Sequence, residues 1–129
     1  MPFLHESVQI SGDLEADLVS AFNAEDKQPQ DDFVDYFQEF PIASDKSAAF
    51  VEVRNGALAE GISVRLSFPH KALSTFGIWR AFQSGVYALA LEPMRRRDPD
   101  AQLDNRLGAL LPGASASYWL ELHLESVSR

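Results

Sequence analysis

Cysteine is absent from this chain of 129 residues, which excludes disulfide bonds and thiolate metal sites. No apolar stretch approaches the roughly 20 residues that are needed to span a bilayer. The N-terminal segment Met-Pro-Phe-Leu-His-Glu also lacks the basic and apolar regions of a signal peptide. These absences predict a soluble protein with no membrane partner, and they favour a cytoplasmic location.

Basic residues are few. The 11 lysines and arginines stand against 19 aspartates and glutamates, and the formal net charge is −8. A field of this sign repels nucleic acids and anionic membrane surfaces, so we expect neither as a partner. The one basic run, residues 95–97, is followed at once by Asp98 and Asp100. This pattern is typical of a locally balanced loop and argues against a phosphate-binding patch.

Length and apolar content predict one domain that spans residues 1–129. A domain of this size buries roughly two-thirds of its unfolded surface, and a hydrophobic fraction of 46% is ordinary for a globular protein. Residues 12–46 are acidic and show few periodic runs, whereas residues 47–127 alternate repeatedly between apolar and polar side chains. Alternation with a period of two indicates half-buried β-strands.

The clearest expected strand covers residues 117–125. Its apolar face consists of Tyr118, Leu120, Leu122 and Leu124. Residues 62–68 predict a second strand, which Pro69 ends because proline cannot donate to a ladder. Residues 50–53, followed by the turn signal Asn55-Gly56, predict a third strand that pairs with the second in antiparallel fashion.

Residues 76–82 and 86–92 predict a hairpin, because the gap between them is short and contains Gly85. Another strand is expected at residues 5–10. Residues 31–40 match a helical stripe at i, i+3, i+4 and i+7, so a short helix or an aromatic loop packed on the sheet is expected there. Closely spaced strands with turns between them predict an all-β fold, an antiparallel β-sandwich.

The strand at residues 86–92 offers a place for chemistry. Its small side chains Ala88 and Ala90 share a face with Glu92, so they leave space above the sheet beside this carboxylate. A carboxylate next to a cleft can act as a general base when its pKa is tuned. The alternative is a solvent-facing Glu92 at the end of a strand that Pro93 stops.

Two neighbours on the preceding strand are candidate binding residues. The ring of Trp79 could stack on the apolar face of a sugar, and Arg80 could donate a fork of hydrogen bonds to sugar hydroxyls or a phosphate. The alternatives are a core or edge-strand tryptophan and a surface arginine.

The acidic segment at residues 98–104 lacks the glycine and the distal glutamate of a calcium loop. We therefore expect no metal site and no cofactor.

A series of features follows the expected hairpin in a set order. A strand ends in Leu91-Glu92-Pro93, a polar loop contains Asp-Pro-Asp-Ala at residues 98–101 and then Asn105, and Leu110-Leu111-Pro112-Gly113 leads into a last alternating strand. In order and spacing, these features resemble the C-terminal part of the aldose 1-epimerase (galactose mutarotase-like) superfamily. The upstream segment Ile78-Trp79-Arg80 is similar to an uncharacterised branch of that superfamily.

The resemblance implies both a fold and an activity. In that superfamily the glutamate on this strand is a general base for the anomeric hydroxyl of an aldose, and a histidine is the general acid on the ring oxygen. By this resemblance Glu92 is the catalytic base. Members are typically more than twice this length, and none of His5, His70 and His123 lies in a motif that matches the acid. The resemblance thus implies that the chain corresponds to the C-terminal portion of a larger sandwich.

Two functions follow as expectations. The first is a mutarotase-like carbohydrate-binding protein, an aldose 1-epimerase if active, whose cleft includes Glu92, Trp79 and Arg80. The second is a non-catalytic β-sandwich that binds a carbohydrate or a protein partner. Half of a large sandwich would leave strand edges open, and open edges invite pairing, so a two-fold homodimer is also expected.

Overall fold

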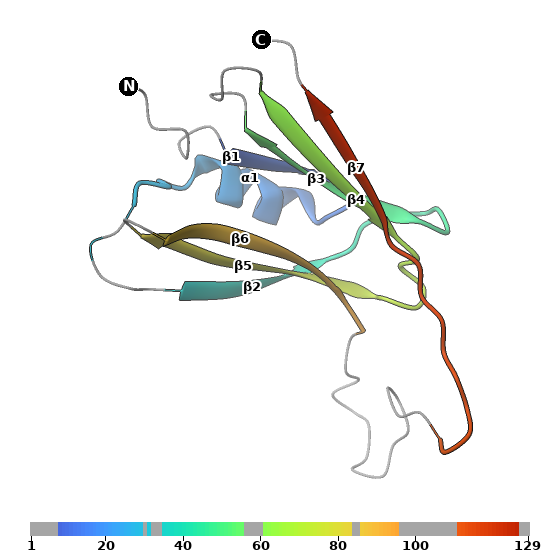
Figure 1. The fold of residues 1–129 in the computed structure, drawn as a ribbon. Coiled ribbons are helices and arrows are strands. Elements are labelled where there is room, and N and C mark those ends of the chain that lie inside the picture. Colours follow the sequence, from blue (N-terminus) through green and yellow to red (C-terminus); the bar gives the residue numbers. More distant parts are fainter. Residues whose placement is uncertain are drawn as a thin grey trace.

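A computed structural model describes residues 8–29, 31, 35–55, 61–83, 86–95 and 111–126. Within these residues the elements in chain order are β1 (Val8–Gly12), α1 (Ala16–Ala24), β2 (Asp35–Pro41), β3 (Ala49–Asn55), β4 (Ile62–Phe68), β5 (Thr75–Gln83), β6 (Val86–Met94) and β7 (Glu121–Ser126) (Figure 1). The predictions made for His5, the turn glycines Gly56 and Gly85, and residues 96–110 lie outside the described residues.

The strands form two antiparallel sheets that pack face to face (Figure 1). The first sheet has the order β1-β3-β4-β7, and the second has the order β2-β5-β6. The prediction of an all-β, antiparallel β-sandwich is therefore confirmed. The expected antiparallel pairings of β3 with β4 and of β5 with β6 are also present.

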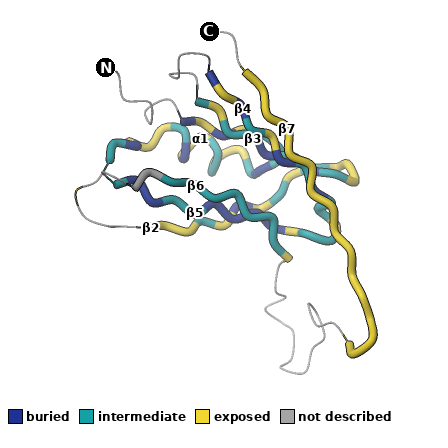
Figure 2. The backbone as a smooth tube through the Cα atoms, viewed as in Figure 1, coloured by how far each residue is buried: buried dark blue, intermediate teal, exposed yellow. Residues whose placement is uncertain are grey.

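The core consists of apolar side chains from the inner faces of both sheets. Buried residues, dark blue in Figure 2, occur on strands of both sheets. The largest fully buried side chains are Phe22, Phe40, Phe68, Phe76, Ile10, Ile78 and Val51. Phe68 of β4 and Phe76 of β5 stack across the interface with ring centroids 5.5 Å apart. Full burial of one such side chain stabilises the fold by about 1.5–3 kcal/mol, so these contacts hold the two sheets together.

Helix α1, which the sequence patterns do not predict, lies between β1 and the second sheet (Figure 1). Glu15 caps its N-terminus, because the carboxylate accepts hydrogen bonds from the backbone N–H groups of Asp17 and Leu18 at 3.1 and 2.9 Å. The buried residue of the helix is Phe22. Its ring meets Phe40 of β2 edge-on, with centroids 6.4 Å apart, and so joins the helix to the core.

Strand β2 replaces the helix or loop that was expected at residues 31–40. It pairs with β5 along its whole length, from Asp35 opposite Ala81 to Pro41 opposite Thr75. Two other boundaries also differ from expectation. The last strand begins only at Glu121, and β6 runs through Pro93 to Met94, which an edge strand tolerates because one side of its backbone needs no ladder donor.

Candidate functional site

The second sheet turns one side to the core and the other side outward. Facing residues of antiparallel strands lie on the same side of a sheet, so where β2, β5 and β6 all pair, their registers assign the outward residues to four cross-strand rows. The rows, which we name together the outer face, are Pro41–Thr75–Met94, Glu39–Gly77–Glu92, Phe37–Trp79–Ala90 and Asp35–Ala81–Ala88.

Two carboxylates flank a glycine in the second row. Glu39 of β2 and Glu92 of β6 stand on either side of Gly77, on strands separated by two spacings of about 4.8 Å each. A Cβ atom at Gly77 would lie 2.3 Å from Cζ of Phe37. The ring of Phe37 therefore covers the glycine in the row that also holds the two glutamates.

The third row holds two aromatic residues, whose rings extend in opposite directions from it, Phe37 over Gly77 and Trp79 toward Asp35. Phe37 is 52% exposed, and Trp79 opposite it on β5 is half-buried. The indole Nε1–H of Trp79 donates a hydrogen bond to Oδ2 of Asp35 at 2.9 Å. Because Asp35 stands one row further along β2, this bond fixes the indole ring diagonally across the strand pair. The outward positions next to Trp79 on β5 and β6 are the alanines Ala81, Ala88 and Ala90, and Gln83 follows Ala81 at the end of β5.

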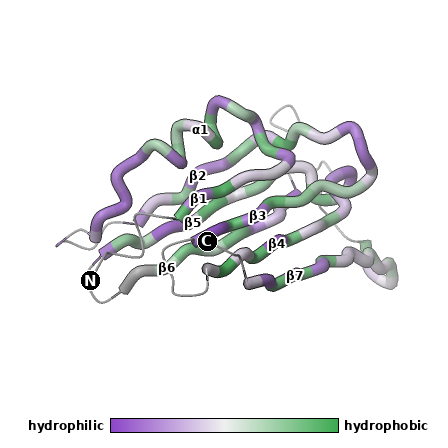
Figure 3. Tube along the Cα trace, turned by 90° about the horizontal axis from the view of Figure 1, so that it is seen from above, coloured by the Kyte–Doolittle hydropathy of each residue, from purple (hydrophilic) through white to green (hydrophobic). Residues whose placement is uncertain are grey.

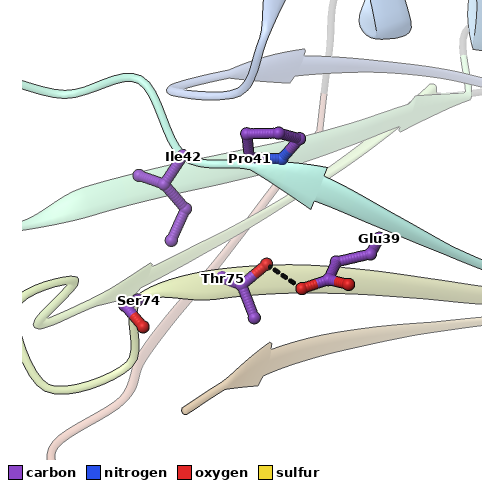
Figure 4. Close-up of a pocket in the computed structure, with 5 residues that line it drawn as sticks. All are labelled: Glu39, Pro41, Ile42, Ser74 and Thr75. Carbon is purple, nitrogen blue, oxygen red and sulfur yellow. Dashed lines mark hydrogen bonds between the residues drawn. The ribbon is translucent and has the colours of Figure 1, made fainter. Parts of the chain in front are cut away.

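A hollow of about 250 Å³ opens at the opposite end of the outer face (Figure 4). It is lined by Glu39, Pro41, Ile42, Ser74 and Thr75. The hydroxyl of Thr75 donates to Oε1 of Glu39 at 2.8 Å, which orients the carboxylate at the rim of the hollow. Glu39 thus belongs both to the hollow and to the row that holds Glu92.

Arg80 lies on the other side of the sheet from Glu92 and Trp79, because successive residues of a strand point to opposite faces. Its guanidinium forms an ion pair with Glu25. The group also lies 5.2 Å from the ring centroid of Phe22. The structure therefore brings Glu92 and Trp79 to one face and directs Arg80 toward helix α1.

Lys27 stands near this ion pair as a buried basic residue. Its Nζ donates to the backbone carbonyls of Asn23 and Glu25 at 3.3 and 3.1 Å, so it satisfies carbonyl groups at the end of α1. Burial lowers the pKa of Lys27, an effect that the negative charge of Glu25 partly offsets and the positive charge of Arg80 reinforces. The cluster is explained by helix capping and packing.

The described histidines lie away from the outer face. His70 follows β4 in a turn, where its ring contacts the carbonyl of Lys46. His123 is exposed on β7, with Nε2 3.4 Å from Oε1 of Glu125. Among the described residues, no group of three or more histidine, aspartate or glutamate side chains is arranged to hold a metal ion.

Three outer-face residues, Asp35, Phe37 and Glu39, were not predicted as site residues. All three lie on β2, the segment that was expected to be a helix or a loop. Polar and aromatic residues occur on both faces of this segment, so it carries no period-of-two signal that could have found them. Once β2 pairs with β5, its register alone brings them beside Trp79 and Glu92.

No family model, no curated protein and no solved structure matches this chain. None of the helices in the described ranges is long and apolar enough to cross a membrane. What the site can do therefore follows from its own chemistry. The outer face combines aromatic rings, which can stack on C–H groups, with carboxylates, which accept hydrogen bonds from hydroxyls.

Proposed function

We propose that this protein is a mutarotase-like carbohydrate-binding protein and that the outer face of the β2-β5-β6 sheet binds the sugar. The observation that carries the proposal is the row of Phe37 and Trp79, which lies between two rows with carboxylates. A pyranose ring has an apolar C–H face and a rim of hydroxyls. The aromatic row matches the first, and Glu39, Glu92 and Asp35 match the second.

The affinity that such a face supports is modest. A hydrogen bond to a charged group contributes about 1.5–3 kcal/mol, but an open face contacts one side of a ligand and leaves the other side in water. We therefore expect a dissociation constant of about 1 mM, which corresponds to about −4 kcal/mol. A neutral sugar is favoured over a sugar phosphate, because the described outer-face residues include three carboxylates and no lysine or arginine.

Aldose 1-epimerase activity with Glu92 as general base is the finer form of this proposal. The base is supported by its place in the row beside Gly77, one row from Trp79. Anomer interconversion also needs a general acid at the ring oxygen, and neither His70 nor His123 lies on the outer face. Binding without turnover is therefore the form that we favour.

A cytoplasmic location is part of the proposal, supported by the absence of cysteine.

The proposal is tested by measuring sugar binding and anomer exchange in the same samples. Neutral aldoses are titrated by calorimetry, and exchange between α and β anomers is followed by NMR. Trp79→Ala should weaken binding about tenfold. Trp119→Ala is the matched control, because the second tryptophan of the chain is exposed outside the outer face, and this variant should bind like the wild type.

Glu92→Gln separates the two forms of the proposal. If Glu92 only accepts a hydrogen bond, the variant should bind the sugar a few-fold more weakly than the wild type. Neither the wild type nor the variant should then accelerate anomer exchange. If Glu92 is the base, the wild type should accelerate exchange and the variant should lose that acceleration. Equal affinities of the wild type and Trp79→Ala for every sugar bound would contradict the carbohydrate proposal altogether.

A further inference from the structure

Strand β7 is the last strand of the first sheet. It pairs with β4 from Ser67 opposite Glu121 to Ile62 opposite Ser126. On its other side, no strand of the described residues pairs with it. The N–H and C=O groups along such an edge can accept another strand.

The core-facing side of β7 is apolar but uncovered. Leu122 and Leu124 lie on the same side of the sheet as Leu66 and Val64 of β4, yet their exposed fractions are 61% and 64%. Leu120, immediately before the strand, is 60% exposed. The strand is therefore exposed along its length (Figure 2). Figure 3 shows that it forms one side of the molecule, where apolar residues alternate with polar ones.

The opposite end of the same sheet is closed. At β1, the side-chain amide of Asn23 on helix α1 binds both backbone groups of Ile10, accepting from its N–H at 2.8 Å and donating to its carbonyl at 2.9 Å. Helix α1 thereby covers the β1 edge at Ile10. Of the two ends of this sheet, β7 is thus the one that combines an uncovered apolar side with an open edge.

We propose that β7 pairs with β7 of a second copy of this chain, antiparallel and about a two-fold axis that passes next to Leu122. This register sets Leu122 opposite Leu122 and, at two symmetric places, Leu120 opposite Leu124. The three exposed leucines of one copy then contact the three of the other. A self-complementary stripe of this kind is what a two-fold interface requires.

The charges on the other side of the sheet support the same register. Glu52, Arg65 and His123 form one cross-strand row on β3, β4 and β7, in which Nη2 of Arg65 lies 3.2 Å from Oε2 of Glu52. In the proposed dimer, Glu121 of the second copy continues this row beside His123. The imidazole has two ring nitrogens, so it can contact this carboxylate as well as Glu125 of its own strand.

Registers whose two-fold axis passes next to His123 or Leu124 either bring like charges together or lose leucine contacts. An axis at His123 sets Glu121 opposite Glu125 twice, and like charges directly opposite each other are destabilising. An axis at Leu124 sets Leu122 opposite Ser126 and so loses leucine contacts. Only the axis at Leu122, among these three, pairs every leucine with a leucine and places no two carboxylates opposite each other. This inference does not depend on the proposed sugar binding.

Disulfide trapping tests the register directly, because the chain has no cysteine of its own. Leu122→Cys, His123→Cys and Leu124→Cys each introduce a single thiol, and the full chain is oxidised at micromolar concentration. Directly opposite residues have Cβ atoms about 4.5–5.5 Å apart, which a disulfide can bridge with small adjustments. Leu122→Cys should form a covalent dimer at least tenfold faster than the other two. Faster trapping of either of those would overturn the register.

Sedimentation tests whether the pairing exists at all. The wild type should sediment as a dimer, and Leu122→Lys should sediment as a monomer that keeps the circular dichroism spectrum of the folded chain, since the substituted side chain is exposed. Ile62→Lys is the matched control, because Ile62 is 46% exposed on β4 and lies off the edge; this variant should remain dimeric. A monomeric wild type at about 100 µM, or a dimeric Leu122→Lys, would overturn the proposal.

Discussion

Asn23 and Ile10 are joined by two hydrogen bonds, one accepted by the amide Oδ1 at 2.8 Å and one donated by Nδ2 at 2.9 Å. The pair connects helix α1 to the edge of β1, thirteen residues earlier in the chain. An edge strand leaves a row of backbone groups without strand partners, and here a single side chain satisfies both groups of one residue. The helix thus both seals this edge and places Phe22 in the core.

Asn23→Ala should lower the free energy of unfolding by about 1–3 kcal/mol, because the two backbone groups of Ile10 lose their partner. Asn23→Asp keeps an acceptor for the N–H but loses the donor, so its loss should be smaller. Ser20→Ala, on the exposed side of α1, is the control and should be near neutral. Urea unfolding of the three variants measures these differences, and equal midpoints for Asn23→Ala and the wild type would contradict the sealing role.

Gly77 and Gly12 are predicted to respond differently to alanine, although each new Cβ would meet an atom at 2.3 Å. At Gly77 the atom belongs to the half-exposed ring of Phe37, which can turn away, so the stability loss should stay near 1 kcal/mol. At Gly12 the atom is the backbone oxygen of Phe50, and φ is +126°. Gly12→Ala should therefore cost at least about 2 kcal/mol.

Chemical denaturation measures both costs, and calorimetry measures sugar affinity for Gly77→Ala. This variant should bind sugar more weakly than the wild type, because the displaced Phe37 ring no longer covers the outer face at Gly77. An unchanged affinity would show that the Phe37 ring has no part in binding. A loss of stability as large as that of Gly12→Ala would show that the ring cannot move.

The lowered pKa of Lys27 predicts that the free energy of unfolding depends on pH in the alkaline range. Burial lowers its pKa in the folded protein below the ordinary value of 10.5, so the unfolded chain keeps this proton to a higher pH. Between the folded pKa and 10.5, the unfolded state binds more protons, and the free energy of unfolding should rise with pH. Lys27→Met should lack this rise. Urea unfolding from neutral pH toward pH 10 compares the two proteins, and parallel curves would contradict the assignment.

The fold was predictable where a strand is half-buried and bounded by turns. Strands β3 and β4 alternate cleanly, and their antiparallel pairing follows from the short connection. Strand β2 was not predictable in the same way, because its aromatic residues lie on both sides, with Phe40 in the core and Phe37 outside. Helix α1 has nine residues, and helices this short depend on tertiary packing more than on local propensity.

The site was predictable within one hairpin and not beyond it. The sequence places Glu92 on a face with small residues, and the β5–β6 register adds Trp79 to that face. Arg80 could have been excluded from the same pattern, since adjacent residues of a strand point to opposite sides. The contribution of β2 depends on a long-range pairing with β5, which the local sequence does not specify.

The central claim, that a sugar binds to the outer face at Trp79, is tested most directly by the two tryptophan indole N–H signals in a ¹H–¹⁵N NMR titration. The chain has two tryptophans, and the Nε1–H of Trp79 is held by Asp35. Adding a neutral aldose to tens of millimolar should shift the Trp79 signal progressively and leave that of Trp119 in place. A spectrum in which the Trp79 signal does not move, or in which only the Trp119 signal moves, would contradict the account.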